Sequence, residues 1–286
     1  MAHDPIMQET TTTTTTTTIV MAALSTLPPP QIATITATVS ALFRLHHRRL
    51  SALLSSHSLF SLSLHHLHEK SLPEKSLLIA RFLLSLLHPI TARMPPSTAT
   101  TTLNDRGVRD RDLDSVLLLL LLCELHQHHP ESLNTLSPTE WRCSLSKHVS
   151  ATMLSLSGVG FSSSEILMKY IEMVARCKRF VGVMGSREWK GGREVAASVA
   201  AVVGLPAVEV EEGGKEECVV CKEEMREGRD VCELPCGHRF HWMCILPWVV
   251  KRNTCPCCRH RLPADDVYGE IERQWEVVVK MGGGYF

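Results

Sequence analysis

The chain has 286 residues, and its 30 basic residues are balanced by 30 acidic ones. Balanced charge argues against the strongly basic classes of protein that bind nucleic acid or anionic membrane surfaces. The strongest apolar stretch, Val116 to Cys123, has eight residues, well short of the roughly eighteen that a membrane-spanning helix needs. The composition therefore favours one or two folded domains with no transmembrane segment.

The first thirty residues do not have the pattern of a folded core. Thr10 to Thr18 are nine consecutive threonines, and a low-complexity run of polar residues does not build a core. We therefore expect residues 1–30 to form a disordered leader rich in Thr and Pro. A cleaved plastid transit peptide is the alternative, because this region is rich in hydroxyl groups and poor in acids, although it lacks arginine.

Residues 31–205 are predicted to form a helical domain. Apolar residues recur at helical spacing from Gln31 to Leu54 and again from Leu59 to Leu67. A further predicted helix begins at Pro73 and is closed by Pro89. We expect a mainly α fold in which this region is a helical bundle that selects a substrate or a location.

The second half of this domain carries stronger helix signals. The stretch 110–129 is predicted to be a long helix that follows a Pro/Thr-rich loop at 91–107. Ser137 with Glu140, and Ser162 with Glu165, have the spacing of capping boxes that begin two more helices. The second of these helices has an amphipathic face made of Leu167, Ile171, Val174, Cys177 and Val181. A short helix at 193–203 and an acidic linker at 206–217 are expected to complete the region.

Eight residues near the C-terminus have the side chains and the spacing of a zinc-binding segment. They are separated by 2, 14, 1, 2, 2, 10 and 2 residues, and in chain order they are Cys218, Cys221, Cys236, His238, His241, Cys244, Cys255 and Cys258. Thiolate and imidazole are the ligands that tetrahedral zinc prefers, and a structural site takes four of them. The segment therefore predicts two structural Zn²⁺ ions, with no open position for a hydrolytic water.

This segment resembles the RING finger in its two-histidine form, RING-H2. The ligand order and every gap fit, and so do Leu234-Pro235 before Cys236 and the pattern Cys-Ile-x-x-Trp from Cys244 to Trp248. The chain is similar to plant RING-H2 ubiquitin ligases of the amyloplast-associated, shoot-gravitropism type. The resemblance implies a RING-type E3 ubiquitin-protein ligase with a role in gravity sensing. It also implies association with the plastid, with the cytoplasm as the alternative.

The resemblance further implies a cross-brace fold of the α+β kind at residues 218–259, in which the ligands alternate between the two metals. One zinc then takes Cys218, Cys221, His241 and Cys244, and the other takes Cys236, His238, Cys255 and Cys258. A segment of about forty residues is too short to bury a sufficient apolar core. We therefore expect metal binding to supply the folding free energy of the finger.

Four residues that are not ligands receive roles from the resemblance. Val220, Trp248 and Pro256 match the family's groove for a ubiquitin-conjugating enzyme, although Trp248 could instead pack into the finger's own core. Arg259 matches the position that bridges the conjugating enzyme and its bound ubiquitin, the alternative being an ordinary surface cation. The implied mechanism orients the ubiquitin thioester for attack by a substrate lysine, with no covalent intermediate on this chain.

Two additional cysteines, Cys232 and Cys257, lie inside the finger. Either could in principle replace a neighbour as a ligand, but the two-residue gap between Cys255 and Cys258 and the sequence around Cys236 favour the assignment above. Paired zinc-type cysteines in a long chain without a secretory apolar region also argue against a disulfide scaffold. We expect a reducing compartment.

A last helix is predicted within the tail, residues 260–286. Asp265 and Asp266 precede an apolar series at helical spacing that runs from Val267 to Val278. Glycines 282–284 are expected to end it. We expect this helix to pack on the finger, and a homodimer formed through it is the alternative.

Other functions compete with the ligase hypothesis. One is a non-catalytic, zinc-stabilised scaffold or an inactive RING partner in a protein complex. Retention of the three groove residues and of Arg259 favours activity over that alternative. A nucleic-acid binder is disfavoured, because the predicted helix of the finger, 241–250, is poor in Lys and Arg.

Overall fold

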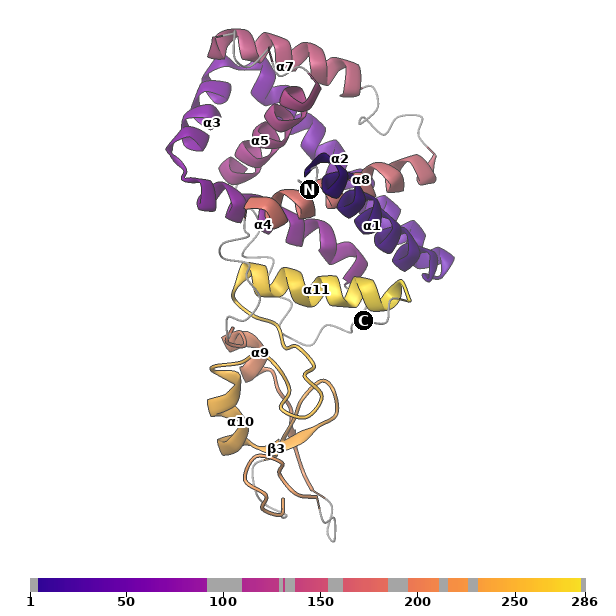
Figure 1. Ribbon diagram of the computed structural model, residues 1–286, viewed down its shortest axis with the longest axis vertical. Helices are drawn as coiled ribbons and strands as arrows, with labels where there is room; N and C mark the ends of the chain where they lie inside the picture. Colours follow the sequence, from indigo (N-terminus) through magenta and orange to yellow (C-terminus); the bar gives the residue numbers. More distant parts are fainter. Residues whose placement is uncertain are drawn as a thin grey trace. The chain divides into compact units, whose positions relative to one another are not determined.

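A computed structural model of the chain describes residues 5–91, 110–128, 131, 137–153, 162–184, 195–210, 216–225 and 231–283. These residues fall into two compact units, one built from the helices α1 to α8 and one that contains the cysteine-rich segment (Figure 1). The expected loop after residue 91 and residues 211–215 of the expected linker lie outside the described residues. In the part of the chain that is described, no helix has the length and apolarity to cross a membrane.

Helix α1 (Pro5–Ser25) occupies the region for which a disordered leader was expected. In this helix Thr18 satisfies its hydroxyl by donating to the carbonyl oxygen of Thr14 at 2.9 Å. The end of α1 docks against helix α8 and buries Val20, Ala23 and Leu24. The expectation of disorder is therefore wrong for residues 5–25, because apolar packing outweighs the low helix propensity of threonine.

Helices α2 (Pro29–Ser55) and α3 (His57–Glu69) follow the two predicted apolar patterns. They are separate helices, because Ser56 is extended and its hydroxyl accepts a hydrogen bond from the backbone N–H of Leu59 at 3.4 Å. A buried histidine, His46, lies on the inner face of α2 beside Phe82 of a later helix, α4 (Leu72–Thr91).

Helix α4 (Leu72–Thr91) supplies much of the core of the first unit. Most of its apolar side chains are buried, and it packs against α5 (Asp110–His128) and α8 (Ser163–Met184). Pro89 lies inside α4 and does not close it as expected, since the helix continues to Thr91. In this last turn the hydroxyl of Thr91 donates to the carbonyl oxygen of Leu87 at 3.2 Å.

Both predicted capping boxes are present. The N–H of Ser137 donates to the carboxylate of Glu140 at 2.7 Å, at the start of α7 (Pro138–Met153). Ser162 and Glu165 make the same contact at 2.8 Å at the start of α8. Most of the predicted apolar face of α8 is buried, and the hydroxyl of Tyr170 on this helix donates to the carbonyl oxygen of Leu86. The mainly helical character of this unit is confirmed.

The second unit begins earlier than the expected boundary at residue 218. The short helix α9 (Val199–Val203) and the strand β1 (Ala207–Val208) belong to it. β1 pairs antiparallel with β2 (Val231–Glu233), which pairs antiparallel with β3 (Arg239–His241). Part of the segment predicted as a linker is thus an edge strand of the finger's sheet, in the order β1-β2-β3.

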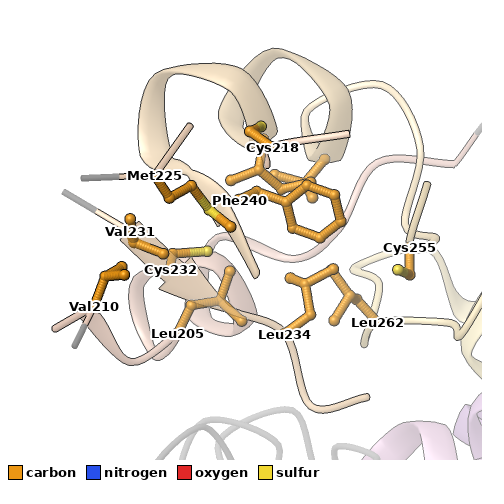
Figure 2. Close-up of a cluster of buried hydrophobic side chains, with 12 residues drawn as sticks. Leu205, Val210, Cys218, Met225, Val231, Cys232, Leu234, Phe240, Cys255 and Leu262 are labelled. Atoms are coloured by element: carbon orange, nitrogen blue, oxygen red, sulfur yellow. The ribbon is translucent and has the colours of Figure 1, made fainter. Parts of the chain in front are cut away.

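Two helices complete this unit, α10 (Trp242–Val249) and α11 (Val267–Met281), the latter belonging to the unit up to Val277. The core gathers around the ring of Phe240, which is fully buried (Figure 2). It is made of Leu205, Val210, Cys218, Met225, Val231, Cys232, Leu234, Phe240, Ile245, Val249, Cys255 and Leu262. Three of these twelve residues are cysteines, so the purely apolar core is small.

Candidate metal centres and surface groove

The eight predicted ligands form two groups in space. One group is Cys218, Cys221, His241 and Cys244, and the other is Cys236, His238, Cys255 and Cys258; within each group the ligand atoms all lie within 4.8 Å of one another. These are the groups that the cross-brace pattern implies. Four soft or borderline donors at this spacing suit tetrahedral zinc, and the chain therefore fits two structural zinc ions.

The first group is organised by His241, which ends strand β3 and precedes α10. Its Nδ1 atom lies 3.3 Å from the sulfur of Cys221 and 3.9 Å from that of Cys244. Cys244 follows one turn later on α10. The strand-to-helix junction thus directs one imidazole and one thiolate at the Cys218–Cys221 turn.

The second group lies at the other end of the β2–β3 hairpin. Nδ1 of His238 is 3.4 Å from the sulfur of Cys236, and Gly237 between them adopts a positive φ of 81°. A residue with a Cβ is strained in that conformation, so glycine suits the tight turn that places both ligands on one side. The remaining ligands, Cys255 and Cys258, come from a turn far along the chain, so each metal joins distant segments.

The two Cys-x-x-Cys turns share one backbone geometry. The N–H of Lys222 donates to the carbonyl oxygen of Cys218 at 2.7 Å, and the N–H of Arg259 donates to that of Cys255 at 3.0 Å. Both Lys222 and Arg259 have a left-handed backbone, with φ of 62° and 60°. This conformation is disfavoured for residues other than glycine, so the turn dictates where each of these two side chains leaves the backbone.

The additional cysteines lie outside both groups. Cys232 is on β2 and fully buried in the core, where burial raises the pKa of its thiol to about 11. Cys257 is exposed, and its backbone N–H lies 3.4 Å from the sulfur of Cys255, to which it donates. Cys232 therefore acts as a small apolar residue, and Cys257 supplies a backbone donor to a ligand sulfur.

The three predicted groove residues lie beside the metal-binding turns or on α10. Val220 precedes a ligand and is 45% exposed, while Pro256 follows a ligand and is half-buried. Trp248 packs one part of its ring on the finger core and remains partly exposed. Its Nε1 atom donates to the carbonyl oxygen of Thr254 at 2.7 Å, which fixes the orientation of the ring. Ile245 is fully buried and belongs to the core, as expected.

One neighbour of the tryptophan was not anticipated from the sequence. The guanidinium carbon of Arg252 lies 5.0 Å from the centroid of the Trp248 ring, which is a cation–π distance. The sequence does contain a signal for this contact, because Trp248 and Arg252 are four residues apart at the end of a predicted helix, and residues at that interval are neighbours on a helix surface. Arg259, by contrast, is exposed at the end of its turn, as a bridging cation would need to be.

Comparison with known proteins agrees with this geometry. Residues 216–259 match the Ring finger domain family. Over 267 residues the chain is 51% identical to the E3 ubiquitin-protein ligase SGR9, amyloplastic, of Arabidopsis thaliana, covering 89% of this chain and 92% of the relative. It is also 49% identical over 81 residues to an E3 ubiquitin-protein ligase RNF181 homolog of Drosophila melanogaster, covering 27% of this chain and 55% of that protein.

A third relative also matches over a short stretch of the chain. The RNF181 E3 ubiquitin-protein ligase of Rattus norvegicus is 43% identical over 84 residues, which cover 29% of this chain and 51% of the relative. Fold and ligand clusters together define a two-zinc RING-type protein. The match to the Arabidopsis ligase covers nearly the whole length of both chains. The chain therefore belongs to the RING-finger E3 ubiquitin-protein ligases.

Proposed function

We propose that the finger binds a ubiquitin-conjugating enzyme charged with ubiquitin and promotes direct transfer of the ubiquitin to a lysine of a protein substrate. The observation that carries this proposal is the placement of four side chains beside the metal-binding turns or on α10. Val220, Trp248 and Pro256 are accessible apolar groups on braced backbone, and Arg259 leaves the last turn into solvent.

The three groove residues are held rigidly, and this rigidity favours binding of the conjugating enzyme. Val220 and Pro256 each lie next to a ligand cysteine, and the Trp248 ring is held by the carbonyl of Thr254. A partner that docks on such groups orders few side chains, so little conformational entropy opposes binding. A central aromatic flanked by aliphatic groups is also the composition of an interface hot spot. Arg252 against the indole adds a positive charge to this surface.

Arg259 is the group proposed to act on the transfer itself. Its planar guanidinium can donate to a carbonyl of the conjugating enzyme and to one of ubiquitin at the same time. In the transfer, the neutral lysine amine bonds to the thioester carbonyl carbon of ubiquitin, the carbon–sulfur bond breaks, and the cysteine of the conjugating enzyme leaves as a thiolate. The amine nitrogen loses one proton as the amide forms, and that proton passes to the departing thiolate or to solvent. Holding the thioester in one orientation accelerates this attack by limiting the geometries that it samples.

We assign choice of substrate and location to the helical unit of residues 5–91, 110–128, 137–153 and 162–184. The relative of similar length is named amyloplastic, which supports association with the amyloplast, and through it a part in gravity sensing. A homodimer through α11 is a less favoured assembly, because two glutamates of α11 already pair with Arg261, which directly follows the finger.

The test of the activity is reconstitution. The purified chain is incubated with activating enzyme, a panel of conjugating enzymes, ubiquitin and ATP, and polyubiquitin is measured. We expect product from the wild type and little from Trp248→Ala or Arg259→Ala. Met243→Ala is the matched control, because Met243 lies on the same helix, is 81% exposed and stands outside the groove. Absence of product with the whole panel would support a scaffold without catalysis.

The proposed location needs a separate test. Fluorescent fusions at either end of the chain are expressed in plant cells that contain amyloplasts. We expect signal at the plastid from at least one fusion. Diffuse signal from both fusions would remove the plastid assignment and leave the ligase activity untouched.

A further inference from the structure

Helix α11 directs two carboxylates at one arginine of the finger. Nη1 of Arg261 lies 2.6 Å from Oε2 of Glu272, and its Nε lies 2.9 Å from Oε1 of Glu276. The two glutamates are four residues apart and therefore share one face of the helix. A rigid fork of donors suits this arrangement, since one guanidinium can pair with both carboxylates. We call these three residues the acidic clamp.

Arg261 lies two residues beyond Arg259, in the segment that leaves the second metal-binding turn. That segment runs alongside residues 253–255. The N–H of Cys255 donates to the carbonyl oxygen of His260 at 2.8 Å, and Thr254 and Arg261 form a β-bridge. The backbone of Arg259 is therefore held from one side by its own turn and from the other by Arg261.

The same helix also fixes the chain further on. Its buried residue Glu270 accepts a hydrogen bond from the N–H of Ala264 at 3.5 Å and pairs with Arg273 at 2.6 Å. Leu262 exchanges hydrogen bonds with Asn253, at 2.6 Å through the backbone and 3.0 Å through the amide side chain. The route from Arg259 to α11 is thus a short, continuous set of contacts.

We propose that the acidic clamp positions Arg259, so that α11 is a working part of the ubiquitin-transfer site and not only a cover for the finger. The proposal rests on the function assigned above. Arg261, Glu272 and Glu276 are positioning residues, because they act through the backbone of Arg259. The groove should be affected far less, since Trp248 is anchored in the finger core and to Thr254. The clamp should therefore influence the rate of transfer more than affinity for the conjugating enzyme.

The kinetic test uses the full chain with both glutamates neutralised, Glu272→Gln with Glu276→Gln. The rate at which ubiquitin passes from a charged conjugating enzyme to free lysine is measured at a fixed concentration of this chain. The concentration of the charged conjugating enzyme is varied, so that kcat and KM can be separated. We expect kcat to fall about threefold to tenfold with KM unchanged, the range that partly exposed ion pairs supply. Glu69→Gln, which removes an exposed ion pair with His65 on α3, is the control and should have no effect.

Rescue and backbone dynamics separate positioning from general stability. Reversing the charges, with Arg261→Glu, Glu272→Lys and Glu276→Lys together, should restore most of the lost rate. Hydrogen exchange of the Arg259 amide should become faster in the glutamine variant. The Lys222 amide, which makes the equivalent hydrogen bond in the other turn, should keep its protection.

The outcomes discriminate between the proposals. A wild-type chain that fails to discharge any conjugating enzyme refutes the proposed function and this inference with it. An active wild type whose glutamine variant retains full kcat and Arg259 amide protection overturns the clamp alone. A variant that loses bound zinc, or that raises KM while kcat stays constant, shows a structural or binding role and also overturns the clamp.

Discussion

A buried histidine, His46, makes the stability of the helical unit depend on pH. His46 is 5% exposed, its ring lies 5.3 Å from that of Phe82 between centroids, and neither ring nitrogen has a hydrogen-bond partner among the described residues. Burial lowers its pKa from 6.5 to about 4. Between these values the unfolded chain binds a proton that the folded chain does not. The free energy of unfolding therefore rises with pH across this window.

The magnitude follows from the two pKa values. A difference of about 2.5, at roughly 1.4 kcal/mol for each pKa unit, corresponds to about 3 kcal/mol. The stability contributed by neutral His46 is complete above pH 6.5 and is lost progressively as the pH falls towards about 4. Since a domain has a net stability of only about 5–15 kcal/mol, this loss should be easy to measure.

The assay is urea unfolding followed by far-ultraviolet circular dichroism at pH 7 and near pH 4. Wild type is compared with His46→Leu, which removes the titrating group and retains an apolar side chain of similar size. The finger is the same in both proteins, so its own response to acid cancels in the comparison. We expect the wild type to lose about 3 kcal/mol more than the variant on acidification. Equal losses in the two proteins would refute the assignment of this pH dependence to His46.

Three further predictions concern the finger. Chelation should remove about 10 kcal/mol or more for each metal site, so amide signals of the β2–β3 hairpin should collapse in NMR spectra while those of α4 persist. Cys232→Ser should lower stability by about 1–3 kcal/mol, the cost of burying a hydroxyl, yet bind two zinc ions per chain by metal analysis. Arg259→Gly and Lys222→Gly should change the free energy of unfolding to a similar extent, by less than about 1 kcal/mol. Only Arg259→Gly should abolish ubiquitin transfer. Equal losses of activity in the two variants would contradict the role of Arg259.

The metal-binding part of the fold was predictable because its information is local and chemical. Ligand type and spacing were enough to identify the eight ligands, and the resemblance to the RING finger implied their division into the two groups that contain His241 and His238. The helices that begin at Ser137 and Ser162 were also predictable, since a capping box lies entirely within four residues. Each capping box and each Cys-x-x-Cys pair lies within four residues of sequence, and the joining of distant pairs at one metal follows from the family pattern.

What could not be predicted depends on distant partners. Helix α1 forms because its end docks on α8, and nothing within the threonine run signals that surface. Strand β1 is two residues long and acquires its conformation by pairing with β2. The clamp on Arg261 joins side chains that are eleven residues apart or more.

The threonine run of α1 has a consequence for variation in the length of the chain. Among the side chains of α1 that the structure describes, which begin at Thr14, the buried ones run from Thr16 to Leu24 and so lie in the last part of this run or after it. A threonine inserted or deleted before Thr14 leaves those residues in the same helical positions, because the neighbours on either side of the change are identical. Copy number in the tract can therefore drift between individuals or species without rotating the buried face. Within α4, by contrast, an inserted residue would rotate buried side chains away from the core, because most of that helix is packed along its length.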